Sequence, residues 1–336
     1  MTRIRSLQPV ALLLLITSLI AALLSGCSAS PTNFTESAPG AVRTVIDAEG
    51  TEVQVPEVPE RIVTLSEPTL DGVLALGVTP VGTVTGRGQS AVPNYLADVA
   101  ADIPILGSVA QPNFEAIGQA APDLILVDGT SINNNPPVIE ALREIAPVVY
   151  TGFAGGDWRL NFELVAEALG MESEGQAVIQ AYDDRVAELR EDLGEYEGST
   201  FSIVRWQGGS AALILNELPP GVALLDLGLA RPENQDRIGR GHSEPVSLEN
   251  LQEIDADYIF FGTLGGSSVD NPNAGGSADI SGAEDALENA VSTPGFTSLN
   301  AYQNDNIILV DGSSWTSTGG PILMNSLIED VAEALL

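Results

Sequence analysis

The sequence predicts an α/β protein with two Rossmann-like lobes, joined by one long α-helix, and a ligand cleft between the lobes. Three observations support this class. Short β-rich runs alternate with helical stretches, which is typical of βα units on a mostly parallel sheet. A long one-sided helical pattern interrupts this alternation near the middle of the chain. A short sequence phrase occurs once on each side of that pattern.

The first half opens with a predicted hairpin, followed by five predicted strands. Residues 43–55 alternate between apolar and polar around Asp47-Ala48-Glu49-Gly50, which is a turn signal. The strands after it are expected at 62–65, 81–84, 103–106, 124–127 and 148–150.

The central helix is expected from Ser173 to about residue 195. Ser173 is a plausible N-cap, and Gln176 would complete a capping box. Apolar residues recur every three or four positions, as one face of a helix requires: Val178, Tyr182, Val186, Leu189 and Leu193. After the helix, strands are expected at 201–206, 212–215, 258–261 and 306–310, and a last helix after Gly319-Gly320-Pro321.

The two halves share a phrase. In the first, Asn113-Phe114-Glu115 is followed by Asp123 and a strand; in the second, Ser247-Leu248-Glu249 is followed by Asp257 and a strand. Each copy has a capping residue, Glu two positions later, and Asp eight positions after that Glu. Together with the long helix between the copies, this repeat favours two similar lobes.

The N-terminus carries an export signal. Arg3 and Arg5 precede an apolar run at 10–24, which is short for a membrane span. Leu24-Ser25-Gly26-Cys27 resembles a bacterial lipoprotein signal, which implies cleavage before Cys27 and lipid on its sulfur and new amino group; a plain secretory signal is the alternative. The expected regions are a signal peptide (1–26), a flexible tether (27–42), a first lobe (43–160), a linking helical region (161–198) and a second lobe (199–336).

Composition narrows the function classes. The formal net charge is −33 and all thirteen basic residues are Arg, which argues against nucleic acid and anionic lipid as partners. Cys27 is the only cysteine, so no disulfide is expected. The single histidine, His242, nearly excludes a multi-histidine metal site.

An enzyme is not the favoured class. A Ser/His/Asp triad would need His242 as its base, and Gly241-His242-Ser243-Glu244-Pro245 is not a G-x-S-x-G motif. A secreted hydrolase is therefore kept only as a remote alternative, and no catalytic residue is assigned.

Binding chemistry fits better, because ligands of open α/β sheets bind at the carboxyl ends of the strands. Arginines and tryptophans would suit a large ligand with anionic oxygens and flat apolar surface. The candidates at strand ends or between the lobes are Arg87, Arg205, Trp206, Trp315, Trp158, Arg159 and His242. For each Arg the alternative is a surface ion pair, for each Trp it is core packing, and for His242 it is a solvated loop position.

Four segments together resemble the substrate-binding lipoproteins of ABC importers that take up ferric siderophores, haem and cobalamin. They are PERIVTLSEPTLDGVLALGVTPVG (59–82), NFEAIGQAAPDLILV (113–127), VSLENLQEIDADYIFF (246–261) and the Trp315…Gly319-Gly320-Pro321 segment. The resemblance runs from about residue 43 to 336 and is strongest to iron–siderophore binders. It implies two lobes on one long helix, a shallow cleft with little closure, and no catalysis.

The resemblance also implies roles for single residues. Arg205 and Arg87 take the positions of cations for the chelate's oxygens, and Trp315 that of an aromatic lining the cleft. A cobalamin or haem receptor stays open as an alternative; haem would want an axial ligand, for which His242 and Tyr95 are the candidates.

The expected partners are a permease dimer with a cytoplasmic ATPase, the iron chelate and, through the lipid on Cys27, the outer face of the cell membrane. The protein is expected to act as a monomer without a covalent cofactor other than this lipid. The family docks its permease with one acidic residue on each lobe. The matching positions are Glu249 and Asp71, with Glu67 as a substitute because the family usually has Glu where this chain has Asp71.

Overall fold

The computed structural model describes residues 40–129, 135–153, 155–266 and 276–336. The first described element is the predicted hairpin, formed by β1 (Val42–Ile46) and β2 (Glu52–Pro56) in antiparallel register. Its turn is held by Asp47, whose Oδ1 accepts the backbone N–H groups of Glu49 at 3.0 Å and Thr51 at 2.8 Å. The hairpin prediction is therefore confirmed.

The strands of the first half form two small sheets connected by a single bridge. Parallel strands in the order β3-β7-β8 form one sheet, and the order β4-β5-β6 forms the other. A parallel bridge between Val63 and Gly82 links β3 to the segment before β4. The strand bounds are Ile62–Thr64 (β3), Thr83–Thr85 (β4), Ile105–Ser108 (β5), Gln111–Pro112 (β6), Leu124–Val127 (β7) and Val148–Tyr150 (β8).

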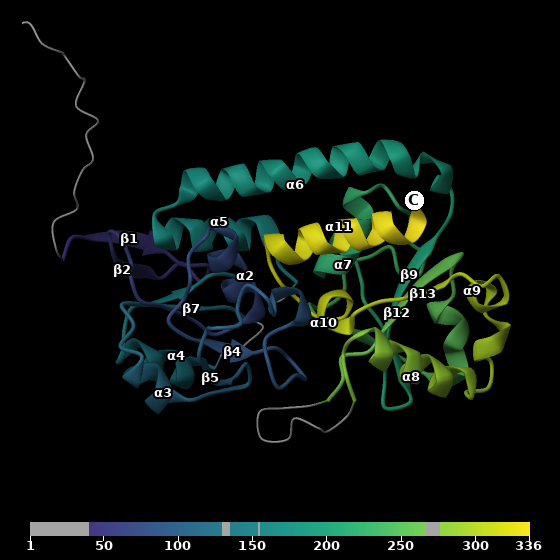
Figure 1. Cartoon of the computed structure of the whole chain (residues 1–336), viewed down its shortest axis with the longest axis horizontal. Helices are drawn as coiled ribbons and strands as arrows, with labels where there is room; N and C mark the ends of the chain where they lie inside the picture. Colours follow the sequence, from purple (N-terminus) through teal and green to yellow (C-terminus); the bar gives the residue numbers. More distant parts are fainter. Residues whose placement is uncertain (1–39, 130–134, 154, 267–275) are drawn as a thin grey trace, which may run out of the picture. The chain divides into compact units, whose positions relative to one another are not determined.

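Four α-helices cover these sheets in the described part of the first half (Figure 1). They are α2 (Glu67–Ala75), α3 (Phe114–Gln119), α4 (Pro136–Arg143) and α5 (Trp158–Leu169), with a short 3-10 helix at Asn94–Leu96. Helix α2 begins with a full capping box, because Ser66 Oγ accepts from Thr69 N at 3.3 Å and Thr69 Oγ1 accepts from Ser66 N at 3.2 Å.

The second half contains one sheet of five strands in the order β11-β10-β9-β12-β13. Strands β9, β12 and β13 are parallel, whereas β10 is antiparallel to both of its neighbours. The expectation of a mostly parallel sheet thus fails at this edge, where a tight Gly208-Gly209 turn joins β9 directly to β10. The bounds are Phe201–Gln207 (β9), Ser210–Leu213 (β10), Glu244–Val246 (β11), Tyr258–Gly262 (β12) and Ile307–Leu309 (β13).

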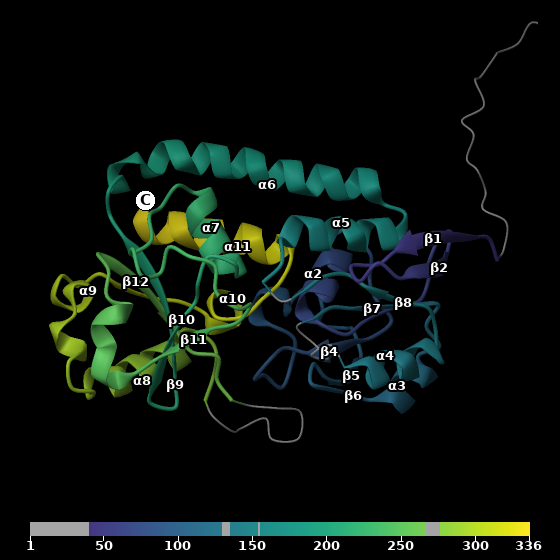
Figure 2. The same cartoon turned by 180° about the vertical axis from the view of Figure 1, so that it is seen from behind.

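The helices of this half surround the sheet, as the rear view in Figure 2 shows. They are α7 (Pro219–Asp226), α8 (Ile280–Val291), α9 (Asn300–Gln303), α10 (Gly312–Trp315) and α11 (Pro321–Leu335). The 3-10 helices span Leu248–Ile254 and Phe296–Ser298.

The predicted connecting helix is α6 (Glu172–Asp192), extended by a 3-10 turn at Leu193–Tyr196. Its 21 residues correspond to about 30 Å of helix. The predicted cap is wrong: the helix begins at Glu172, with Met171 at the N-cap position and no side-chain cap. Glu172 and Glu174 in the first turn instead complement the positive end of the helix dipole.

The two halves share one large core cluster, which runs from the β1–β2 hairpin along α5, α6 and α11 to the second sheet. Helix α6 lies beside α5 at one end and beside α11 at the other in both views (Figures 1 and 2). Helix α11 also contacts α2 and α7. The long helix is therefore not the only element that joins the halves, because the last helix of the chain packs on both of them.

The repeated phrase has the same structural role in both copies. Asn113 and Ser247 each cap a helical segment with their side chains. Asp123 accepts the backbone N–H groups of Glu60 and Arg61, both at 2.9 Å, just before β3, and Asp257 accepts that of Thr200 at 2.9 Å just before β9. Each aspartate therefore connects the start of one strand to the start of the neighbouring parallel strand in the same half. The arrangement of sheets and helices in the two halves confirms the predicted two-lobed α/β class.

Candidate ligand-binding pocket

A pocket lies between segments of the two halves. It holds about 330 Å³ of space that protein atoms do not fill, part of it open to solvent. Arg87 enters it from the first half, just after β4, and Arg205 enters it from β9 in the second. The other described lining residues are Leu218, Gly241, His242, Ser243, Thr316, Ser317 and Thr318. The pocket thus joins three of the residues that the sequence nominated for ligand binding.

Arg205 stands near the end of β9, beside the antiparallel strand β10. Its side chain is half-buried, and its guanidinium donates to Ser243 Oγ. Burial, together with the positive charge of nearby Arg87, lowers the pKa of Arg205 from its ordinary value. The two cations are therefore close enough to repel each other, which a bound anion would relieve.

The loop that carries Arg87 is fixed by Glu67 in the first turn of α2. Glu67 is 3% exposed, and its Oε1 accepts the backbone N–H of Arg87 at 2.7 Å. The next residue, Gly88, has a φ of +67° and approaches Leu264 of the second half, where an added Cβ would lie 3.3 Å from the carbonyl oxygen. A glycine therefore suits both the backbone angle and the close approach.

The loop that carries His242 is fixed in the same manner by Glu217. This buried carboxylate accepts the backbone N–H groups of Gly239 at 2.7 Å and Gly241 at 3.1 Å. His242 is exposed at the pocket, with Nδ1 2.9 Å from the carbonyl oxygen of Ser243. Sequence reasoning missed Glu217, although it precedes the two prolines that start α7 much as Glu67 precedes Pro68 in α2.

The three tryptophans do not line the pocket, which corrects their nomination as ligand contacts. Trp206 is 1% exposed and packs against Phe261 and Phe296 on one face of the second sheet. Trp315 is fully buried, stacks on Phe260 at 4.2 Å and donates from Nε1 to Asp330 at 2.8 Å.

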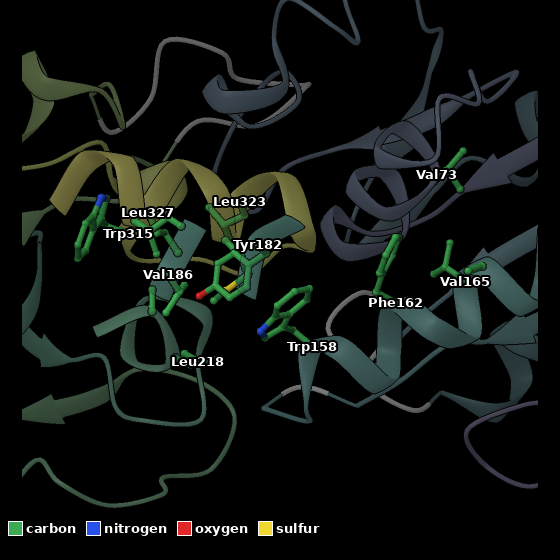
Figure 3. Packing of buried hydrophobic residues seen from close by; sticks show 14 of the residues in the cluster. Val73, Trp158, Phe162, Val165, Tyr182, Val186, Leu218, Trp315, Leu323 and Leu327 are labelled. Carbon is green, nitrogen blue, oxygen red and sulfur yellow. The ribbon is translucent and has the colours of Figure 1, made fainter. Parts of the chain in front are cut away.

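Trp158, the third tryptophan, lies at the start of α5. It packs edge-on against Tyr182 of α6, with the ring centroids 5.1 Å apart (Figure 3). Core packing, the alternative held open for each tryptophan, is what the structure contains.

Arg159 is also placed away from the pocket. Its guanidinium forms ion pairs with Asp183 of α6 at 2.6 Å and Asp226 of α7 at 3.3 Å. It also lies over the Trp158 ring, 4.6 Å from the centroid. Arg159 therefore joins α5, α6 and α7, and the ion-pair alternative replaces its proposed contact with ligand.

Asp71 cannot serve as a docking residue on the surface. It is fully buried, and its two carboxylate oxygens accept the backbone N–H groups of Ile322 at 2.8 Å and Leu323 at 2.9 Å, in the first turn of α11. Burial raises its pKa to about 6, against the effect of these hydrogen bonds. Glu67 is buried as well, so the substitute is excluded for the same reason.

Glu249 is exposed in the 3-10 helix capped by Ser247, as a docking residue must be. Its counterpart in the repeated phrase is Glu115, which is exposed in α3 just after the cap Asn113. Glu115 and Glu249 therefore occupy matching exposed positions in the two copies of the phrase.

Tyr95, a candidate axial ligand for haem, is not among the described residues that line the pocket. Its hydroxyl is buried against Gly319, where an added Cβ would lie 2.4 Å away, and against Asp71. Burial and the charge of Asp71 raise the pKa of Tyr95. Of the two axial ligands considered for haem, only His242 lies at the pocket.

Comparison with known proteins identifies the family. The family model described as "Periplasmic binding protein" matches residues 62–313, and the chain belongs to this family. It is 31% identical over 314 residues to the probable siderophore-binding lipoprotein YfiY of Bacillus subtilis (strain 168), covering 92% of each chain. It is 25% identical over 297 residues to the Fe(3+) dicitrate-binding periplasmic protein FecB of Escherichia coli (strain K12), covering 86% of this chain and 89% of that one.

A solved structure supports the same class. The structure of Staphylococcus aureus SirA complexed with staphyloferrin B matches with a TM-score of 0.71 and 27% identity, over 87% of this chain and 98% of that one. The resemblance stated from the four sequence segments is confirmed. Within the described residues no helix is both long and apolar enough to cross a membrane, and Cys27 lies outside those residues.

Proposed function

We propose that this protein is the lipid-anchored solute-binding component of an ABC importer, which captures a ferric siderophore in the pocket and delivers it to a membrane permease. The observation that carries the proposal is the meeting of Arg87 and Arg205, from opposite halves, at one pocket. Membership of the periplasmic binding protein family and similarity to siderophore-binding relatives support it.

The proposed mechanism is capture and presentation without covalent chemistry. The two guanidiniums would hold the anionic oxygens of the chelate, and the surrounding hydroxyls would complete its hydrogen bonds. The iron is cargo held by its chelator. The lipid on Cys27 would keep the protein beside its permease, with a cytoplasmic ATPase driving release and transport.

Docking is proposed to use Glu249 and its repeat counterpart Glu115. Both are exposed and follow a capped helix start at equal spacing in the two halves. Carboxylates in matching places on two similar lobes suit a permease dimer that presents two cationic patches.

The proposal is tested by direct binding. Because all three tryptophans lie in the core, calorimetry and co-elution of the coloured ferric complex are better readouts than fluorescence quenching. We expect at least one ferric siderophore or ferric citrate to bind with a Kd at or below the micromolar range. Preferential binding of haem or cobalamin in the same assay would reassign the cargo, and binding of none of these ligands would contradict the proposed function.

A further inference from the structure

The pocket is chemically unlike the rest of this molecule. The chain has 46 acidic and 13 basic residues. The described residues that line the pocket nevertheless include Arg87, Arg205 and His242 and no Asp or Glu. An anion approaching the protein elsewhere meets a strongly negative surface. Two arginines and a histidine therefore come together among described lining residues of which none is acidic.

Arg205 is the strongest part of this argument. Among the described residues no carboxylate lies within ion-pair distance of it, whereas Arg143, Arg159, Arg185 and Arg237 all have such partners. Its guanidinium donates to the neutral hydroxyl of Ser243. Burial and the charge of Arg87 both lower the pKa of Arg205, which means that they disfavour its charged form. A bound anion would offset this free-energy cost.

Ser317 provides an independent observation. This pocket residue is only 7% exposed, and its hydroxyl has no hydrogen-bond partner in the described structure. An unsatisfied buried hydroxyl costs free energy unless something binds it. A ligand oxygen in the pocket would accept this hydrogen bond.

The pocket offers little to an apolar ligand. Leu218 is the one aliphatic side chain larger than a threonine among its described lining residues, and none of them is Phe, Tyr or Trp. Its volume of about 330 Å³ is near the lower end for small-molecule sites. A bulky ligand that carries several aromatic rings would therefore find little apolar surface to pack against.

We propose that the pocket selects compact ferric chelates that carry negative charge on carboxylate or hydroxycarboxylate groups, in preference to neutral hydroxamate and bulky catecholate complexes. This inference rests on the proposed function. Carboxylates match the planar fork of a guanidinium, with two parallel hydrogen bonds. The hydroxyls of Ser317 and Ser243 serve the remaining oxygens.

The test compares three probes on the purified full-length chain in detergent: ferric citrate, the neutral tris-hydroxamate ferrichrome and the tris-catecholate ferric enterobactin. We expect ferric citrate to bind at least about tenfold more tightly than either of the others, which is about 1.4 kcal/mol. Equal or tighter binding of ferrichrome or ferric enterobactin would overturn the inference while sustaining the proposed function. Binding of none of the three would count against both.

Variants assign the preference to the pocket. We expect Arg205→Gln to weaken ferric citrate binding about 10- to 100-fold, and Ser317→Ala about threefold. Arg143→Gln is the matched control, because it removes the same charge from an exposed pair with Glu140 outside the pocket. An unchanged Kd in Arg205→Gln, with a normal thermal melt, would refute the assignment.

Discussion

At the scale of single residues, two buried glutamates perform the same task in the two halves. Glu67 accepts the backbone N–H of Arg87, and Glu217 accepts those of Gly239 and Gly241. Each glutamate stands at the start of a proline-initiated helix and fixes a loop that contributes to the pocket. They position loops that line the pocket, and neither glutamate is among its described lining residues.

The variant Glu217→Gln tests this role. The amide keeps the shape of the side chain but replaces one acceptor oxygen with a donor, so one of the two N–H groups loses its partner. We expect a loss of about 1 to 3 kcal/mol in the free energy of unfolding and a rise of about tenfold in the Kd of the bound chelate.

Calorimetry and chemical denaturation measure the two effects. Glu233→Gln is the control, since Glu233 is an exposed glutamate in the same connection between α7 and β11. If Glu217→Gln binds ligand like the parent protein, Glu217 does not set the geometry of the loop.

At the scale of elements, helix α11 begins with its N-cap, Gly320, lacking a side-chain cap. Asp71 of α2 supplies the missing acceptors from another part of the chain. A carboxylate at a helix N-terminus is favourable because it faces unsatisfied N–H groups and the positive end of the dipole. The complete burial of Asp71 opposes this effect, because it disfavours the ionised carboxylate and raises the pKa of Asp71 to about 6.

This arrangement predicts a pH-dependent stability. The pKa of Asp71 is about 6 in the folded state and 3.8 as its ordinary value. Between these values the folded protein holds a proton that the unfolded chain has released, so the contribution of Asp71 to stability falls as pH rises from about 4 to about 6. Relative to Asp71→Asn, the parent protein should lose about 3 kcal/mol of unfolding free energy across this window.

Urea unfolding at several pH values between 4 and 7, followed by tryptophan fluorescence, measures this difference. Tyr95 is the titratable side chain that acts on Asp71, and the pKa of Tyr95 is raised far outside this range. Asp98→Asn, at an exposed position, is the control. Parallel stability curves for the parent and Asp71→Asn would contradict the prediction.

Most helices and strands could be predicted from the sequence, whereas the contacts and roles of single side chains could be predicted less well. Alternation and helical spacing located the hairpin, the strands β7 and β8 and the helix α6, because these patterns are local. The same patterns could not show that Trp315 stacks on Phe260, since that contact depends on the packing of distant segments. Arg87 and Arg205 could be nominated because each lies near the carboxyl end of a strand, and the structure brings them to one pocket although their strands belong to different sheets. Asp71 was misassigned because its partners lie about 250 residues away.

At the scale of the whole molecule, the repeat places Glu115 and Glu249 at matching sites on the two halves. If both contact the permease, Glu115→Ala and Glu249→Ala should each retain chelate binding and reduce cellular iron uptake about tenfold or more. The reason is that each substitution removes one of two charge contacts to a partner surface.

Uptake of radioactive iron by cells that carry each variant is the measurement. Glu253→Ala is a matched control, because Glu253 is an exposed acid in the same 3-10 helix as Glu249. Normal uptake in either docking variant would remove that residue from the docking surface.

The capping of α11 by Asp71 also constrains the order of events when the chain is made. Asp71 belongs to α2, the first described helix of the chain, but its hydrogen-bond donors belong to the last helix. A chain made from its N-terminus would therefore lack the α11 partners of this carboxylate until the final helix was complete. Completion of the first lobe is thus tied to arrival of the last segment, so truncation within α11 should impair the folding of residues that precede it by some 250 positions.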